Sequence, residues 1–159
     1  MPLVYTIRNG ILTGSCQLPI IPHTMKGFVS NIEQETLENE DFRRVLYTAE
    51  HCQLVLMCIP AGGEIGEEVH DVDQFIRIEE GEGESILDGV ERDLTDGSVI
   101  IIPAGVRHNI KNVLPDEPLK LYSLYAPPHH KDATVHRTKE DAMKSEEEFD
   151  GETTDDLTP

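Results

Sequence analysis

Short apolar runs separated by turn residues are the feature that most restricts what this chain can fold into. From residue 45 onward the runs follow one another closely, and they show no helical period. Two of them flank Asp88-Gly89, a pair that favours the positive φ angles of a type I′ hairpin turn. Many short strands at this spacing predict an all-β sandwich or small barrel. The expected strands cover residues 45–48, 53–59, 64–70, 74–80, 85–87, 90–94, 98–102, 106–112 and 119–125.

The segments on either side of this strand region are less regular. At 159 residues the chain has room for one domain with its own core. We expect an N-terminal arm over residues 1–44, a barrel over residues 45–126, and a C-terminal extension with an acidic tail over residues 127–159. Residues 32–44 are expected to form a helical turn or to pack on a partner subunit. Residues 138–148 are expected to form a short exposed helix, followed by a frayed tail that is dispensable for folding.

The formal net charge of −18 restricts the partners of the chain. It argues against binding to nucleic acid or to an anionic membrane surface. No apolar run approaches the roughly 20 residues of a membrane-spanning helix, and the N-terminal sequence does not resemble a signal peptide. Cys16, Cys52 and Cys58 form no CxxC pair, which is typical of unpaired thiols in a reducing compartment. We therefore expect a cytoplasmic protein.

Three polar residues interrupt the strand pattern between residues 66 and 81. Glu68 and His70 are two positions apart, so in an extended strand both side chains point to the same face. Gln74 follows after a short polar corner, at the start of an apolar run. Carboxylate, imidazole and amide groups can all bind a metal ion, whereas a strand that faces a core is expected to carry apolar side chains. These residues are therefore candidates for a functional site.

The spacing of these residues resembles the two sequence motifs of the cupin family. Glu68 stands where the first motif usually has a histidine, and Gln74 stands where it usually has a glutamate. The second motif, which contains His108, is present without a gap. The resemblance covers roughly residues 45–126 and implies a double-stranded β-helix, the jelly-roll barrel of the cupins. The matching positions are Gly62, Glu68, His70, Gln74, Gly81, Gly97, Pro103, Gly105, His108 and Asn112.

The resemblance implies one divalent transition metal ion per chain, bound by Glu68, His70, Gln74 and His108. The usual ligands of the family, three histidines and one glutamate, carry a single negative charge, and these four residues carry the same charge. Two oxygen and two nitrogen donors suit Mn²⁺, Fe²⁺, Co²⁺ or Ni²⁺ better than a closed tetrahedral zinc site, although Zn²⁺ can also bind. Four ligands in an octahedron leave room for water, substrate or dioxygen. The alternative is a cupin that has lost its metal and keeps a polar pocket.

Two classes of function fit the resemblance. The chain is similar to small bacterial cupins described as mannose-6-phosphate isomerase-like, in which a metal would polarise a sugar carbonyl, and to dioxygenase cupins. Either enzyme would act on a small molecule, with Glu68 as the candidate catalytic base. Tyr122 and Lys120 alternate on one face of the last strand and are candidates for substrate contact, although ordinary packing is the simpler interpretation. The alternative class is a non-catalytic cupin that binds a small-molecule ligand.

Two further features lie outside this candidate site. His129, His130 and His136 follow the last strand; an adjacent pair of histidines can indicate metal ligands, but exposed loop histidines without a role are the simplest interpretation. Cupins generally pair through a sheet outside the ligand site, and the apolar run at residues 53–60 offers a candidate surface. The resemblance therefore implies a homodimer.

Overall fold

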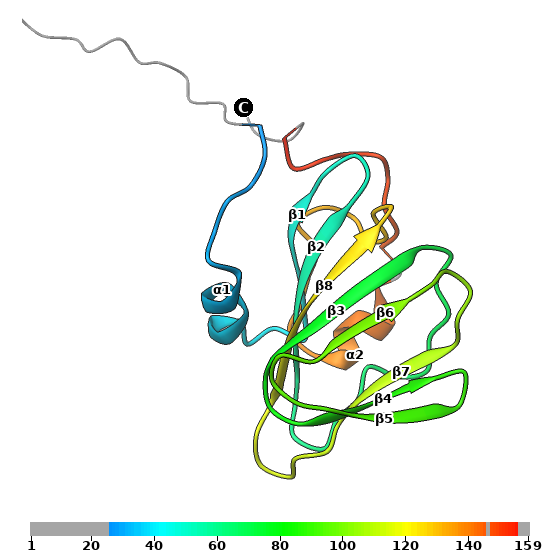
Figure 1. Cartoon of the computed structure of the whole chain (residues 1–159). Coiled ribbons are helices and arrows are strands. Elements are labelled where there is room, and N and C mark those ends of the chain that lie inside the picture. The colour runs from blue at the N-terminus through cyan, green and yellow to red at the C-terminus, as the bar shows by residue number, and fades with distance from the viewer. Residues whose placement is uncertain (1–25, 146, 156–159) are drawn as a thin grey trace, which may run out of the picture.

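The computed structural model describes residues 26–145 and 147–155, and it shows two antiparallel sheets that face each other (Figure 1). Helix α1 (Ile32–Glu38) precedes the strands, and helix α2 (Lys139–Lys144) follows them. The all-β, double-stranded β-helix fold expected from the sequence is confirmed. The strands are β1 (Arg43–Thr48), β2 (Gln53–Ile59), β3 (Asp73–Glu80), β4 (Gly83–Leu87), β5 (Val90–Leu94), β6 (Val99–Ile102), β7 (His108–Asn112), β8 (Leu119–Ala126) and β9 (Val135–His136).

The hydrophobic core lies between the two sheets. The larger sheet has six strands in the order β6-β3-β8-β2-β1-β9, and the smaller sheet has three in the order β5-β4-β7. Figure 1 shows the smaller sheet lying against one face of the larger sheet. Because this face is covered, the side chains that point from it toward the smaller sheet are mostly apolar. β3 pairs with both β6 and β8, which places Gln74 in the interior of the larger sheet. The core includes Val55, Met57, Ile59, Ile76, Ile78, Ile110, Leu119 and Leu121.

Local sequence signals explain where several elements begin and end. Asp88 and Gly89 join β4 to β5 with φ angles of 48° and 80°, as a type I′ turn requires, so the predicted hairpin is confirmed. Asn31 caps α1 through its side chain, and this helix is the helical turn expected within residues 32–44. Thr138 and Asp141 form a capping box at α2; the predicted short helix is present, but it ends at Lys144 rather than at residue 148.

The segment at residues 64–70 is not the regular strand that the sequence predicts. It makes two isolated bridges to β7, at Glu64 and at Glu68. Between them Gly66 has a φ angle of +110°, which lies outside the β region and interrupts the pleat. The side chains of Glu68 and His70 still lie on the same side, as the sequence predicts, with His70 Nε2 3.2 Å from Glu68 Oε2.

The C-terminal residues 147–155 dock onto the barrel, so the prediction of a frayed tail is wrong for this segment. Thr154 accepts a hydrogen bond from the Thr48 amide at 2.8 Å and donates its own amide to the Thr48 carbonyl at 3.0 Å. The Tyr47 hydroxyl donates to the Asp155 carboxylate at 3.0 Å. These contacts join the end of the described chain to the end of β1. The acidic composition of the segment did not reveal these specific partners.

Deletion of residues 147–159 is expected to lower the melting temperature by about 4–8 °C. The loss removes several hydrogen bonds at Thr154 and Asp155, each worth about 1 kcal/mol, from a domain in which 1 kcal/mol corresponds to about 2–4 °C. Thermal unfolding followed by circular dichroism measures the shift. Glu152→Ala is the control and should leave the melting temperature unchanged, because the Glu152 side chain is exposed. An unchanged melting temperature for the deletion would contradict the docking.

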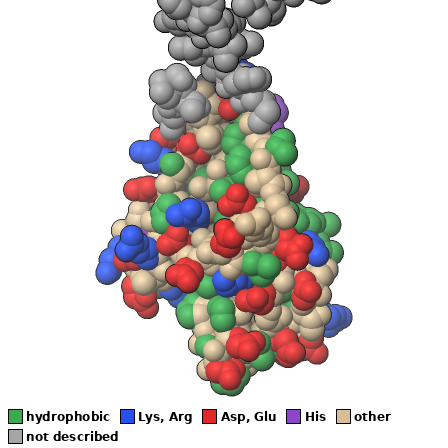
Figure 2. All heavy atoms as spheres, turned by 90° about the vertical axis from the view of Figure 1, so that its left-hand side faces the viewer, with side chains coloured by type: hydrophobic (Ala, Val, Ile, Leu, Met, Phe, Trp, Pro, Cys, Tyr) green, Lys and Arg blue, Asp and Glu red, His purple; other side chains and the backbone are tan. Residues whose placement is uncertain are grey.

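The apolar run at residues 53–60 does not offer the open dimer surface expected from the sequence. β2 lies inside the larger sheet between β1 and β8, and alternate side chains of β2 join the core. Leu56 points to the opposite face and is only 1% exposed. Helix α1 packs on that face, where Lys120 of β8 donates a hydrogen bond to the Leu37 carbonyl. Figure 2 views the molecule from the α1 side and shows charged side chains of both signs mixed with apolar ones.

The homodimer itself stays a prediction. Exposed apolar side chains on the outer face of the larger sheet lie nearer its β6 edge, where Val99, Ile101 and Leu124 are 55%, 66% and 37% exposed. We expect a dimer in size-exclusion chromatography with light scattering, shifted toward monomer by Ile101→Asp, because association would bury the new charge. A wild-type monomer at all concentrations would refute the prediction.

Candidate metal centre

Glu68 and His108 are held opposite each other by a pair of backbone hydrogen bonds. The Glu68 amide donates to the His108 carbonyl at 2.9 Å, and the His108 amide donates to the Glu68 carbonyl at 2.9 Å. Residues paired in this way across an antiparallel bridge have side chains on the same face. The pairing therefore brings a carboxylate from the irregular segment before β3 next to an imidazole from β7, which lies much later in the chain.

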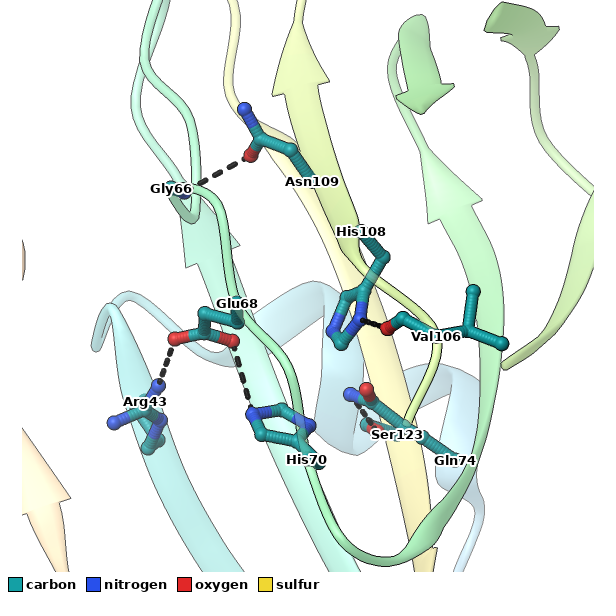
Figure 3. Close-up of polar contacts among 9 residues, drawn as sticks. All are labelled: Arg43, Gly66, Glu68, His70, Gln74, Val106, His108, Asn109 and Ser123. Atoms are coloured by element: carbon teal, nitrogen blue, oxygen red, sulfur yellow. Dashed lines mark hydrogen bonds and ion pairs between the residues drawn. The ribbon is translucent and has the colours of Figure 1, made fainter. Parts of the chain in front are cut away.

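His70 completes a compact group with these two residues. Each of Glu68, His70 and His108 offers one ligand atom, and these atoms all lie within 4.8 Å of one another, a spacing that can hold a metal ion. The Nε2 atom of His70 lies 3.2 Å from Oε2 of Glu68. The two imidazole rings meet edge to face with centroids 4.9 Å apart. Figure 3 shows the three side chains converging, with Gln74 next to His108.

Gln74 comes from β3 and turns its amide oxygen to the same group of residues. It is 2% exposed, and its Nε2 donates a hydrogen bond to the Ser123 hydroxyl on β8 at 2.9 Å (Figure 3). This bond fixes the amide orientation, so the carbonyl oxygen Oε1 is the atom left available. Oε1 is buried and has no hydrogen-bond partner in the described part of the chain. A buried amide oxygen in this position is a donor for a hard or borderline cation.

His108 presents an unprotonated nitrogen to the group. Its Nδ1 lies 2.9 Å from the Val106 carbonyl, and a carbonyl only accepts, so Nδ1 carries the proton. The lone pair is then on Nε2, which is buried and has no partner among the described residues. Hydrogen bonds of this kind, from the ring nitrogen that does not bind the metal to a backbone carbonyl, orient metal-bound histidines. Val106 therefore sets the tautomer that a metal ligand needs.

The charges at the site suit a cation. Burial raises the pKa of Glu68 and is the largest single influence, but the hydrogen bond with His70 and the nearby Arg43 guanidinium together bring it below its ordinary value. Arg43 Nη2 lies 3.7 Å from Oε1 of Glu68. Burial lowers the pKa of His108. At neutral pH the site thus holds an ionised carboxylate and a neutral imidazole, the forms that bind metal.

The donor set fits a metal ion. His70 Nδ1, Gln74 Oε1 and His108 Nε2 are all buried without a hydrogen-bond partner among residues 26–145 and 147–155. Each such atom costs about 1–3 kcal/mol when it stays unsatisfied, so three in one place call for a common partner. A cation near Glu68 would satisfy the lone pairs of the amide and the imidazoles together. The predicted ligands Glu68, His70, Gln74 and His108 are thus brought to one place by the fold.

Comparisons with known proteins agree with this geometry. The family model described as a cupin domain matches residues 55–125, which include all four candidate ligands. The uncharacterized protein YrkC of Bacillus subtilis is 45% identical over 129 residues, or 77% of this chain and 69% of YrkC. The crystal structure of BH2720 from Bacillus halodurans is also 45% identical, covers 77% of this chain and 98% of that one, and has a TM-score of 0.74. This chain is a cupin.

A solved structure with lower sequence identity is similar to this chain in fold only. An RmlC-like cupin of Methanocaldococcus jannaschii, described as having a double-stranded β-helix fold, is 21% identical and covers 57% of this chain and 84% of its own. Its TM-score of 0.51 supports the shared barrel. Within the described residues of this cupin, no helix is both long and apolar enough to cross a membrane.

Arg43 is a residue of this cupin's site that sequence reasoning missed. It was assigned to the N-terminal arm, whereas the structure begins β1 at Arg43 and pairs it with His136 of β9. Its side chain is 9% exposed and reaches Glu68 (Figure 3). No sequence motif contains it. The sequence shows only an arginine at the start of an apolar run. This pattern is too common to predict that Arg43 forms a buried ion pair.

The histidines after β8 were expected to be exposed, and the structure shows that this is wrong for His130 and His136. They are only 8% and 7% exposed. The Gln53 side chain holds the His130 backbone on both sides, accepting from its amide at 2.9 Å and donating to its carbonyl at 2.6 Å. The His129 ring lies 4.4 Å from the His70 ring, centroid to centroid, and stacks on Tyr125 at 5.4 Å.

Tyr122 and Lys120, the candidates for substrate contact, lie on the other face of β8. Ser123 and Tyr125 point inward from this strand, and residues that alternate with them point outward. Tyr122 contacts Phe75 on the outer face, with ring centroids 6.1 Å apart, and Lys120 bonds to α1. The structure therefore does not bring this pair to the candidate site. The alternation of residues along the strand correctly predicts that Tyr122 and Lys120 share one face of β8. It does not predict that this face is the outer one.

A small cavity opens beside Glu68 and His70. Its volume is about 220 Å³, which is below the roughly 300–1,000 Å³ of pockets for drug-sized ligands and leaves room for only a few atoms. The docked C-terminal segment and α2 form one wall, and the residues after β8 form another. The cavity is lined by Arg43, Glu68, His70, His129, His130, Ala142, Ser145, Glu147 and Glu148.

The metal-free cupin is expected to lose stability as the pH falls from about 7 to about 5. Burial, with nearby Arg43, lowers the pKa of His130 to about 2, against about 6.5 in an unfolded chain. Below pH 6.5 the unfolded state takes up a proton that the folded state does not, so the free energy of unfolding falls by up to about 1.4 kcal/mol per pH unit for this group.

His130→Phe removes this group and should make the pH dependence shallower. Burial lowers the pKa values of His108 and His129 as well, so part of the slope remains in the variant. Urea denaturation of both proteins at pH 5, 6 and 7 measures the difference. Equal slopes for wild type and His130→Phe would contradict a buried, neutral His130.

Proposed function

We propose that this cupin binds one divalent transition metal ion through Glu68, His70, Gln74 and His108, and uses it to act on a small molecule. The observation that carries the proposal is the set of three buried, unpartnered donor atoms beside an ionised carboxylate. Two nitrogen and two oxygen donors favour Mn²⁺, Fe²⁺, Co²⁺ or Ni²⁺, with Zn²⁺ as a further candidate.

The cavity beside Glu68 and His70 supports an enzyme more than a purely structural metal site. A bound ion of this kind would supply a Lewis acid for a carbonyl group or, where it is redox-active, an oxidation centre. Glu68 is the proposed base, because its hydrogen bond with His70 and the charge of Arg43 keep it ionised despite its burial. His129 lies against His70 and lines the same cavity, so it helps to exclude water from the ligand side of the site.

The charges around the cavity favour a substrate without a phosphate group. Of the described residues that line the cavity, Arg43 is the one with a side chain that is always positively charged. Its guanidinium already lies next to the carboxylate of Glu68. Glu147 and Glu148 line the same cavity and are exposed. A sugar phosphate is normally held by several cationic side chains. We therefore favour a dioxygenase-like oxidation of an unphosphorylated small molecule over the isomerisation of a sugar phosphate.

Metal content tests the ligand assignment directly. We expect about one transition metal ion per chain in untagged wild-type protein reconstituted with Fe²⁺ or Mn²⁺, measured by elemental analysis. His108→Ala and Gln74→Ala should each retain less than about one tenth of it, since loss of a ligand or its orientation costs 10- to 100-fold in metal affinity. His51→Ala is the matched control, because His51 is an exposed histidine whose side chain is 85% accessible. Full metal content in His108→Ala would refute the site.

Nitric oxide added to the Fe²⁺-loaded protein without oxygen distinguishes an enzyme from a closed site. An open coordination position predicts the electron paramagnetic resonance signal of a ferrous nitrosyl complex. Retained iron without this signal would contradict the dioxygenase-like proposal and would support a non-catalytic cupin that only binds its ligand.

A further inference from the structure

His129 brings an accessible imidazole to the cavity beside Glu68 and His70. The residue lines this cavity and is half-buried. Its ring nitrogens make no hydrogen bond to another described residue, and they are not among the buried atoms that lack a partner. His108 differs, because its Nδ1 is bonded to the Val106 carbonyl and its Nε2 is buried. A molecule that enters the cavity can therefore reach a nitrogen of His129.

Packing and backbone hydrogen bonds hold the His129 ring in place. The ring stacks on Tyr125 with centroids 5.4 Å apart and an angle of 27° between the planes, and it lies 4.4 Å from the His70 ring. The His129 amide donates to Oε1 of Gln53 at 3.3 Å, and its carbonyl accepts from the Phe149 amide at 3.1 Å. A side chain that its neighbours already hold in one orientation loses little freedom when it binds a ligand.

His129 stands beside the candidate metal ligands but is not one of them. The ligand atoms that lie within 4.8 Å of one another belong to Glu68, His70 and His108, and no atom of His129 joins this group. Burial, together with the nearby His70, lowers the pKa of His129, so its imidazole is neutral near pH 7. A neutral imidazole offers one N–H donor and one lone pair. The ring therefore has hydrogen-bonding capacity next to the site that neither the metal ligands nor the fold uses.

We infer that His129 is the ligand-binding residue of this cavity, and that one of its ring nitrogens hydrogen-bonds to a small polar molecule held at the candidate metal centre. The inference rests on the proposed function, because the metal centre is what holds this molecule beside His129. The cavity of about 220 Å³ leaves room for only a few atoms, so the molecule, or the part of it that enters, is small. A fixed imidazole that can donate or accept suits the polar atoms of such a molecule.

Modification by diethyl pyrocarbonate tests the accessibility of His129 in the metal-free full chain. The reagent attacks unprotonated imidazole nitrogens, and mass spectrometry of peptides locates the product. We expect His129 to react at least about tenfold faster than His108, because a buried nitrogen reacts only when the structure opens locally. The exposed His51 should react faster than both. Equal rates for His129 and His108 would overturn the inference.

Azide, titrated into the Co²⁺-loaded full chain, tests the hydrogen bond itself, and the visible spectrum of Co²⁺ reports its binding without turnover. His129→Phe keeps a ring that stacks on Tyr125 but removes both nitrogens, and it should weaken azide binding by roughly 10- to 100-fold, because a hydrogen bond to a charged group is lost. His129→Gln should bind azide more tightly than His129→Phe, since its amide again offers a donor and an acceptor. His51→Phe is the control and should not change the affinity. Unchanged azide affinity in His129→Phe would overturn the inference.

Cobalt content of the same samples separates the inference from the proposed function. His129→Phe and His129→Gln should keep the cobalt content of the wild type, because His129 is outside the group of candidate ligands. Loss of cobalt from both variants would make His129 part of the metal site and would overturn the inference. No cobalt in the wild type would instead refute the proposed function, and the modification rates in the metal-free chain would still decide whether His129 is accessible.

Discussion

The reciprocal backbone hydrogen bonds between Glu68 and His108 are the contact on which the candidate site depends. They join an irregular segment before β3 to the first residue of β7, and so hold together ligands from distant parts of the chain. Gly66 bends the segment out of a regular strand just before this contact. Directly after this bend Glu68 pairs with His108, and Nε2 of His70 lies 3.2 Å from Oε2 of Glu68.

Near this contact the interior of the barrel contains buried polar side chains in place of apolar ones. Gln74 and His108 are each 2% exposed in the middle of a β-sheet core, and each keeps one hydrogen-bonding atom unused. Their remaining atoms are bonded to Ser123 and to the Val106 carbonyl, which fixes the direction of the unused ones. A chain that is otherwise consistent in its strand pattern and core tends to break these rules at its functional site. The cost of the unpaired atoms is balanced if a metal ion binds them.

The sequence was sufficient to predict the barrel and to select four candidate ligands that the fold brings together, because both depend on local spacing. Period-two alternation, the Asp88-Gly89 turn and the glycines between runs define most strands, and the motif positions locate Glu68, His70, Gln74 and His108. Sequence could not show which face of β8 is buried, so Tyr122 and Lys120 were open candidates for substrate contact, although they lie outside the site. Spacing within a strand is a local property, whereas the direction of its face is set by the sheets that pack on it.

The features that the sequence did not reveal all come from tertiary contacts. Arg43 becomes part of the site only because β1 pairs with β9, and His130 is buried only because Gln53 holds its backbone and residues 147–155 dock beside it. None of these partners is near in sequence to the residue that it places. They matter because Arg43 and His130 line the cavity that opens beside Glu68 and His70.

Anomalous X-ray scattering from a crystal of the Mn²⁺-loaded protein tests the central claim most directly. The account predicts a single strong manganese peak per chain, contacted by Glu68, His70 Nδ1 or Nε2, Gln74 Oε1 and His108 Nε2, with the Gln74 amide still bonded to Ser123. A peak at a different set of residues, or no peak after reconstitution with excess Mn²⁺, would contradict it.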